Sequence, residues 1–249
     1  MNIQKYLNRI GYNESLEPTL KVLSSLQTAH LFSVPFENLD IHNNIKINLD
    51  NSFDKIVNRK RGGFCYELNG LFYLLLKEIG FNTKLVSARV YQGEKGFGDE
   101  FDHMAIIVRI DIDDYLVDVG FGDFSYSPLK IILNKEIVDP RSSFMIEKYD
   151  KEYNIVKQKS DDGSFIPKYL FSEKKREIKD FNEMCVFHQT SEESHFTQNK
   201  ICSLPVINGR ITLSGNTLIS SINGSIETLE LKTDNEIKKV LKDYFKIEL

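Results

Sequence analysis

The hydrophobic pattern of this chain changes period between Gly80 and Asn82, and this change limits the folds that the chain can adopt. Up to Gly80, apolar residues recur at helical spacing. The clearest set is Leu68, Leu71, Phe72, Leu75 and Ile79. From Asn82 onwards, short runs rich in β-branched and aromatic residues lie between Gly, Asp and Asn clusters. The pattern predicts a helical lobe followed by an antiparallel sheet or barrel.

Within the helical lobe, residues 3–10 predict a short helix, and Pro18 opens a longer one. The face of the longer helix carries Leu20, Leu23, Leu26, Ala29 and His30. Residues 34–40 interrupt the pattern as a structured turn, and residues 53–58 lead to a helix that begins at Cys65.

The strand-like runs of the middle region are residues 84–91, 103–110, 115–119, 144–149 and 153–157. Residues 177–190 predict a return to helix. Turn signals at Asn208-Gly209, Gly215-Asn216 and Asn223-Gly224 then predict a β-meander. A capping box formed by Thr233 and Glu236 predicts a final amphipathic helix.

The composition is that of a soluble globular protein, and the net charge of −4 argues against general binding to nucleic acid or anionic membranes. No apolar run approaches the roughly 20 residues that span a bilayer. The N-terminal residues lack the apolar segment of a signal peptide. We therefore expect a cytoplasmic protein.

The 3 cysteines are Cys65, Cys185 and Cys202, and their spacing fits neither a disulfide framework nor a C-x-x-C metal site. Cys185 and Cys202 lie in apolar surroundings, so we expect them to be buried small hydrophobes. We expect no metal.

Cys65 is different, because it follows the glycines of Arg61-Gly62-Gly63 and begins a helix. Unpaired backbone N–H groups at a helix N-terminus favour the thiolate, and the basic run at residues 59–61 adds positive charge nearby. Cys65 is therefore a candidate nucleophile.

A cysteine nucleophile needs a base, usually histidine, and a group that orients the base. Among the 5 histidines, His103 opens a strand directly after a glycine-rich acidic loop, where an imidazole can face a cleft. Asp118 is embedded in an apolar strand that ends in glycines, so its carboxylate needs a hydrogen-bonding partner. Asp102 is a rival orienting group, but as the neighbour of His103 in a strand it should point to the opposite face.

Hairpin pairing does not by itself bring His103 and Asp118 together. With a loop at residues 111–114 the two side chains lie on the same face of the sheet. Asp118 is then about four residues along its strand from the position directly opposite His103. From the residues alone, an acyl-transfer site and a purely structural role for Cys65, His103 and Asp118 both remain open.

The stretch Arg61-Gly62-Gly63-Phe64-Cys65-Tyr66-Glu67 resembles the signature around the nucleophile of the arylamine N-acetyltransferases. Further motifs of that family match in order along nearly the whole chain. They are Val34-Pro35-Phe36-Glu37-Asn38-Leu39, His103-Met104, Val117-Asp118-Val119-Gly120-Phe121-Gly122, Ser194-His195-Phe196-Thr197, Cys202-Ser203-Leu204-Pro205 and Gly209-Arg210-Ile211-Thr212-Leu213-Ser214-Gly215.

The resemblance implies an α+β fold with a cysteine-protease-like core and three lobes. These are an N-terminal helical bundle at 1–82 that carries the nucleophile, a central antiparallel β-barrel at 83–190 that carries His and Asp, and a C-terminal α/β lid at 191–249.

The resemblance also implies roles for individual residues. Cys65 would accept the acetyl group of acetyl-CoA, His103 would be the base, and Asp118 would orient it. The other implied residues are Phe36 and Phe121 in the acceptor pocket, Thr197, Ser214 and Gly215 at CoA, and Glu37 with Arg61 as a buried ion pair that braces the nucleophile loop.

The implied reaction is ping-pong acetyl transfer from acetyl-CoA to an aromatic amine or hydrazine. Aromatic amines are neutral near pH 7, so they can enter an apolar pocket without the cost of desolvating a charge. The chain departs from the family at Asp123, where a glycine is common, and in the charged loop at 93–102, so its acceptor preference is open.

Two alternatives remain. One is a related Cys-His-Asp acyltransferase, amide synthase or hydrolase that uses another acyl donor. The other is an inactive relative that only binds CoA or a partner, although a binding module has no need of Cys65, His103 and Asp118 together.

Overall fold

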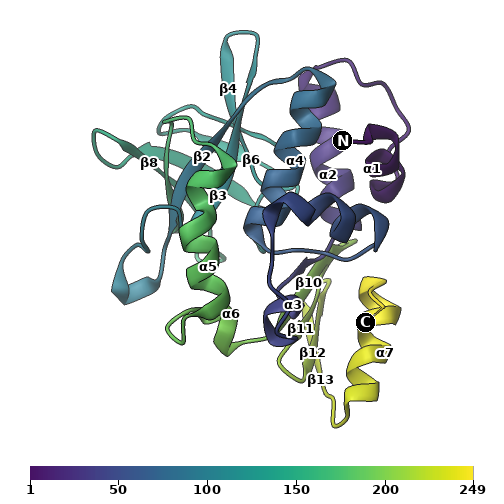
Figure 1. The fold of residues 1–249 in the computed structure, drawn as a ribbon. Helices are drawn as coiled ribbons and strands as arrows, with labels where there is room; N and C mark the ends of the chain where they lie inside the picture. The colour runs from purple at the N-terminus through teal and green to yellow at the C-terminus, as the bar shows by residue number, and fades with distance from the viewer. Residues whose placement is uncertain (249) are drawn as a thin grey trace.

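The computed structural model describes residues 1–248 and has the α+β fold that the change of period predicts (Figure 1). The main helices of the N-terminal part are α1 (Ile3–Ile10), α2 (Leu20–Ser33) and α4 (Cys65–Ile79). The side chains of Asn2 and Thr19 cap α1 and α2, and Gly11 and Gly80 end α1 and α4 with left-handed backbone. Between α2 and α4 lie α3 (Leu39–His42) and the short helical turns η1 (Leu49–Asn51) and η2 (Asp54–Asn58).

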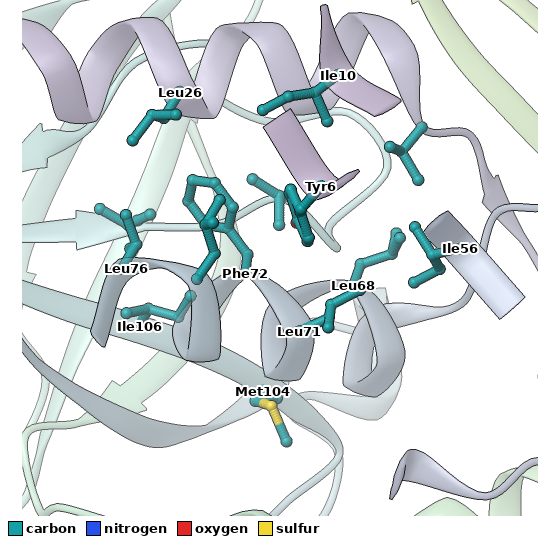
Figure 2. Packing of buried hydrophobic residues seen from close by; sticks show 14 of the residues in the cluster. Tyr6, Ile10, Leu26, Ile56, Leu68, Leu71, Phe72, Leu76, Met104 and Ile106 are labelled. Carbon is teal, nitrogen blue, oxygen red and sulfur yellow. The ribbon is translucent and has the colours of Figure 1, made fainter. Parts of the chain in front are cut away.

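These helices bury a shared apolar core. Tyr6 of α1, Leu26 of α2 and Phe72 of α4 are fully buried there, and Met104 and Ile106 pack against α4 from the neighbouring strand (Figure 2). The core therefore fixes α4, which begins at Cys65, against the strand that begins at His103.

The central sheet has eight antiparallel strands in the order β5-β4-β3-β2-β9-β8-β7-β6. They are β2 (Asn82–Val90), β3 (His103–Ile110), β4 (Asp113–Val117), β5 (Leu129–Lys130), β6 (Glu136–Val138), β7 (Ser143–Lys148), β8 (Tyr153–Lys159) and β9 (Phe165–Ser172). Leu133, just after the edge strand β5, bridges to Ile146 of β7, so the sheet curls into a nearly closed barrel. Its core includes Ala105, Phe144 and Tyr169. The helical turn η3 (Gly93–Lys95) lies in the β2–β3 connection.

The β3–β4 hairpin is tighter than we expected. Ile110 pairs with Asp113 through a two-residue turn, and Asp111 has a φ of 54° there. The expected loop at 111–114 is therefore wrong. If the observed β3–β4 pairing is extended, His103 lies opposite Gly120. Asp118 is two residues from Gly120 and therefore on the same face of the sheet.

Strands β5, β6 and β9 of the barrel were not predicted. In β9, Pro167 interrupts the strand pattern. The proline lies where the β8–β9 register shifts: Val156 pairs with Tyr169 but Lys157 pairs with Pro167. Lys168 is thus the extra residue of a β-bulge.

After the barrel, η4 (Ile178–Phe181) and α5 (Asn182–Thr190) form the predicted helix, and α6 (His195–Gln198) follows. The predicted meander is β10 (Ile201–Val206), β11 (Gly209–Ser214), β12 (Thr217–Ile222) and β13 (Ser225–Glu230). Strand β1 (Phe36–Glu37) adds to its edge by pairing with β10, so residues 34–40 contain a strand as well as a turn. We call β1 and β10–β13 the C-terminal sheet.

The final helix α7 (Asp234–Phe245) begins with the predicted capping box of Thr233 and Glu236. It covers the apolar face of the C-terminal sheet, where Cys202, Leu213 and Leu218 are buried. Among residues 1–248, no helix combines the length and apolar character needed to cross a membrane.

Candidate active site

Cys65 is the first residue of α4 and is almost fully buried. The Tyr66 backbone N–H stabilises its thiolate, but burial and then the charge of Asp102 raise the pKa of the Cys65 thiol well above its ordinary value. The helix N-terminus alone therefore does not ionise this thiol, and a reaction through its thiolate would need a base.

The two arginines of the basic run at residues 59–61 do not supply the activation that we expected. Arg59 pairs with Asp54 at the surface, and Arg61 is held by Glu37 and Asp40. Because these cations are paired with carboxylates, their charge is largely neutralised before it can act on Cys65.

His103 and Asp118 meet in the interior. His103 Nε2 and Asp118 Oδ2 are 2.7 Å apart, and both side chains are buried. Burial alone would raise the pKa of Asp118. The charge of His103 and hydrogen bonds from His103, Asn69 and the Gly120 N–H outweigh burial and hold that pKa below its ordinary value. A lowered pKa favours the ionised carboxylate of Asp118 in contact with the His103 imidazole.

Local backbone geometry places the Asp118 carboxylate. Strand β4 ends at Val117, and Asp118 Oδ1 accepts the N–H groups of Gly120 at 2.9 Å and Phe121 at 3.0 Å. This turn moves the carboxylate off the strand path and toward His103, which ideal hairpin pairing does not do.

Gly120 brings this turn against Cys65. A Cβ atom at Gly120 would lie 2.8 Å from Cys65 Cα and 2.7 Å from Asn69 Nδ2. Only glycine permits this approach, so the turn that carries Asp118 packs directly on the start of α4.

The sequence reasoning missed two side chains that hold Asp118. Asn69 donates from Nδ2 to Asp118 Oδ1 at 2.8 Å and to the Met104 carbonyl at 2.6 Å, and its Oδ1 accepts the Val119 N–H. Tyr169 donates its hydroxyl to Asp118 Oδ2 at 3.1 Å. Asn69 was detectable, because it follows Cys65 by one helical turn and lies on the same face.

The two expected pocket aromatics lie in different parts of the site. The Phe121 ring is 5.3 Å from the His103 ring, and Phe36 is 6.0 Å from Phe196. Phe196 also lies 6.0 Å from Phe64, next to Cys65. Phe36, Phe121 and Phe196 are only half-buried, so each presents apolar surface.

Glu37 and Arg61 form a buried ion pair within a larger charged cluster. Arg61 contacts Glu37 at 2.8 Å and Asp40 at 2.9 Å, and Lys55 contacts Asp40 and Glu67. Glu67 Oε2 also accepts the Phe64 N–H at 3.2 Å, next to the nucleophile. Burial, opposed by Lys55 and reinforced by Glu37, raises the pKa of Glu67 to about 7.

The three residues expected at CoA lie at one end of the C-terminal sheet. Ser214 is the last residue of β11 and Gly215 follows it in the turn to β12. The Gly215 N–H donates to the carbonyl of Lys200, just after α6. Thr197 lies in α6, but its hydroxyl already donates to the carbonyls of Ser191 and Ser194.

The charged features that depart from the family are held by protein partners. Asp123 pairs with Arg141 at 2.7 Å. In the acidic loop, Glu100 accepts from Ser87, Tyr153 and Arg176, and Asp102 contacts His188 at 3.1 Å rather than His103.

Comparisons with known proteins agree on one family. The N-acetyltransferase family model matches residues 19–249. The pineal gland isozyme NAT-10 of arylamine N-acetyltransferase from Gallus gallus is 33% identical over 276 residues, with 100% of this chain and 95% of that protein covered. Arylamine N-acetyltransferase 1 of Homo sapiens is 33% identical over 275 residues, with the same shares covered.

Solved structures agree with the sequence relatives. The arylamine N-acetyltransferase of Mycobacterium marinum superposes with a TM-score of 0.91 at 27% identity, over 99% of this chain and 93% of that chain. A structure of the M. marinum enzyme in complex with CoA gives the same TM-score, identity and coverage. The resemblance seen in the sequence motifs is thus confirmed, and the chain belongs to the arylamine N-acetyltransferase family.

Proposed function

We propose that this chain transfers the acetyl group of acetyl-CoA to an arylamine or hydrazine through a thioester on Cys65. Membership of the family makes the chain an N-acetyltransferase, and a structure similar to it holds CoA. The observation that carries the mechanism is the buried bond between His103 Nε2 and Asp118 Oδ2. It occupies one imidazole nitrogen and leaves Nδ1 to act on the thiol.

In the first half-reaction, His103 Nδ1 takes the proton of Cys65, and the thiolate attacks the carbonyl carbon of acetyl-CoA. The bond from that carbon to the CoA sulfur then breaks. CoA leaves as a thiol with the proton that His103 held, and the acetyl group remains on Cys65.

In the second half-reaction, the amine nitrogen attacks the acetyl carbon and gives a proton to His103. Cys65 leaves as a thiolate and regains the proton from His103, so the products are an N-arylacetamide, or an acetylhydrazide from a hydrazine, and the free enzyme. Asp118 stays ionised throughout and stabilises the imidazolium that forms in each half-reaction.

The acceptor pocket in this proposal is lined by Phe36, Phe121 and Phe196. Their half-buried rings offer an apolar surface to a neutral aromatic amine, whereas an alkyl ammonium would lose its hydration there. A dry surface around the acetyl-cysteine also slows its hydrolysis. Thr197, Ser214 and Gly215 remain proposed contacts of CoA.

Each of the three lobes has its own part in the proposed reaction. We propose that residues 1–82 supply Cys65 and that residues 83–190 supply His103 and Asp118. Residues 191–249 would then cover the donor.

A matched pair of measurements tests the function. Acetyl-CoA without amine should add one acetyl group to Cys65 and release one equivalent of CoA thiol, and an arylamine should then permit continuous release. Cys65→Ala should fold but release no thiol. Continuous release without amine would favour a hydrolase, and release from another acyl thioester alone would favour the related acyltransferase.

A further inference from the structure

Three cationic side chains gather where the barrel approaches the C-terminal sheet. They are Arg141 in the β6–β7 turn, Lys168 on β9 and Arg210 on β11, and we call them the cationic cluster. Asp123 is the carboxylate within electrostatic reach of all three. It forms its ion pair with Arg141. Asp139 also lies near Arg141, but its oxygens already accept the N–H groups of Tyr126, Ser127 and Arg141.

Lys168 reaches this position because of the β-bulge in β9. At the bulge, Lys168 has no pairing partner on β8. The next residue is Tyr169, whose hydroxyl contacts Asp118. Bulges commonly re-aim a side chain next to a functional site. Lys168 is half-buried, and within residues 1–248 its ammonium takes part in no ion pair.

One of the guanidinium nitrogens of Arg210 lacks a hydrogen-bond partner within residues 1–248. Its Nη1 donates to Ser203 Oγ at 2.9 Å, but its Nε is buried and has no hydrogen-bond partner within residues 1–248. Burial lowers the pKa of both Arg210 and Lys168. The charge of Asp123 raises these two pKa values in part, and the positive charge of Arg141 lowers them further. A bound anion would offset the cost that burial imposes on both cations.

The register of the C-terminal sheet connects Arg210 to the site. Phe36 pairs with Ser203, and Ser203 pairs with Thr212, so these three side chains share one face. Arg210 and Ser214 lie two residues to either side of Thr212 and therefore also share it. The opposite face is the one that α7 covers. Arg210 thus lies on the same surface as a pocket aromatic and an expected CoA contact.

We propose that the cationic cluster binds a phosphate group of CoA. The inference rests on the proposed function, because it assigns residues to the donor of that reaction. CoA carries several phosphate charges on a flexible chain that leads to the thioester, and Lys and Arg groups are the usual partners of phosphate. Within residues 1–248, Lys168 and Arg210 take part in no ion pair, whereas Arg141 is paired with Asp123. In a chain of net charge −4, this cluster also draws the anionic donor toward Cys65.

The test compares donors that differ in charge but form the same acetyl-Cys65. Lys168→Gln and Arg210→Gln should each lower kcat/KM for CoA release from acetyl-CoA roughly tenfold, as expected for a charge-assisted hydrogen bond. Acetyl-pantetheine and p-nitrophenyl acetate have no phosphate, so their rates should change far less. Lys238→Gln is the matched control, because Lys238 is exposed on α7, on the far side of the same sheet.

A second readout does not need turnover. CoA binding to Cys65→Ala protein, measured by calorimetry, should weaken about tenfold when Lys168→Gln or Arg210→Gln is added. If wild-type protein forms no acetyl-Cys65 but this loss of CoA binding is seen, the proposed function fails and the anion site stands.

Three outcomes would overturn the inference. The first is equal loss with charged and neutral donors, which would mean general damage to the site. The second is unchanged use of acetyl-CoA by both variants. The third is a loss only in the second half-reaction with 4-aminobenzoate and not with a neutral arylamine, which would assign the cluster to an anionic acceptor.

Discussion

Asn69 donates a hydrogen bond of 2.8 Å to Asp118, and this contact joins the helix that begins at Cys65 to the carboxylate that contacts His103. The same amide nitrogen contacts the Met104 carbonyl on β3, and the Asn69 oxygen accepts the Val119 N–H. One side chain therefore connects α4, β3 and the Asp118 turn.

Asn69→Ala should therefore slow acetylation of Cys65 more than it harms the fold. The change leaves the Met104 carbonyl and the Val119 N–H buried without partners, which costs about 1–3 kcal/mol of stability for each group. We expect kcat for acetyl-CoA to fall at least tenfold while KM changes little, measured at a temperature where the variant is folded. Asn8→Ala on α1 is the control, because its side chain makes only an exposed contact with Gln4. An equal fall in kcat for both variants would contradict the positioning role.

Gly120→Ala and Gly122→Ala form a second matched pair. A Cβ at Gly120 would meet Cys65 Cα at 2.8 Å, whereas a Cβ at Gly122 meets nothing within 4 Å. Gly120→Ala must push the Asp118 turn away from α4, so we expect loss of most acetyl transfer and a lower melting temperature. Gly122→Ala should keep the rate of acetyl transfer within about twofold of wild type. Its melting temperature should change little, since surface substitutions change stability by less than about 0.5 kcal/mol. Comparable activity of the two variants would contradict the close packing.

Glu67 makes stability depend on pH in a predictable direction. Its cluster holds three carboxyl groups and two cations, and the pKa of Glu67 in the folded state is about 7, above the ordinary value of 4.5. Between these values the folded chain binds more protons than the unfolded chain, so the Glu67 contribution to stability falls as pH rises and levels off above pH 7.

Urea unfolding of wild type and Glu67→Gln at several pH values from 4.5 to 8 measures this effect. The stability of wild type relative to the variant should fall by about 2–3 kcal/mol across that range. The lowered pKa values of Asp40 and Asp118 act the opposite way, since their stabilisation is lost as pH falls below about 4. Those two groups are common to both proteins, so the difference isolates Glu67. A difference that stays constant with pH would mean that Glu67 remains ionised.

The sequence predicted most of the helices and strands well but predicted side-chain contacts poorly. Helix starts and strand composition are local properties, so the Cys65 helix, the His103 strand and the Thr233 capping box were all identified from local patterns. The approach of Asp118 to His103 depends on a two-residue turn and on side-chain hydrogen bonds to the backbone, which period and composition do not encode. Strand β9 was missed because Pro167 lies at a bulge, where proline is tolerated.

The electrostatic environment of Cys65 was also predicted incompletely, for a related reason. The cations near Cys65 in sequence are neutralised by carboxylates that the sequence pattern does not place beside them. Arg61 pairs with Glu37 and Asp40, which are distant in sequence, and Arg59 pairs with Asp54 in η2. Charges that act on the thiol, such as Asp102, come from the loop before β3, which is distant from Cys65 in sequence. Which charge faces which group is a tertiary property.

Selective alkylation tests how Cys65 becomes reactive. All three cysteines are buried, and burial raises the pKa of each thiol, to about 12 for Cys185. Reactivity at neutral pH therefore needs a proton acceptor, and the proposed site gives only Cys65 one, in His103. Iodoacetamide at pH 7 should label Cys65 at least tenfold faster than Cys185 or Cys202, as followed by peptide mass spectrometry. His103→Gln should remove most of that preference while leaving the slow labelling of the other two unchanged. If Cys65 stayed equally reactive without the imidazole, its helix N-terminus would be the source of activation after all, and the assignment of His103 as the base would fail.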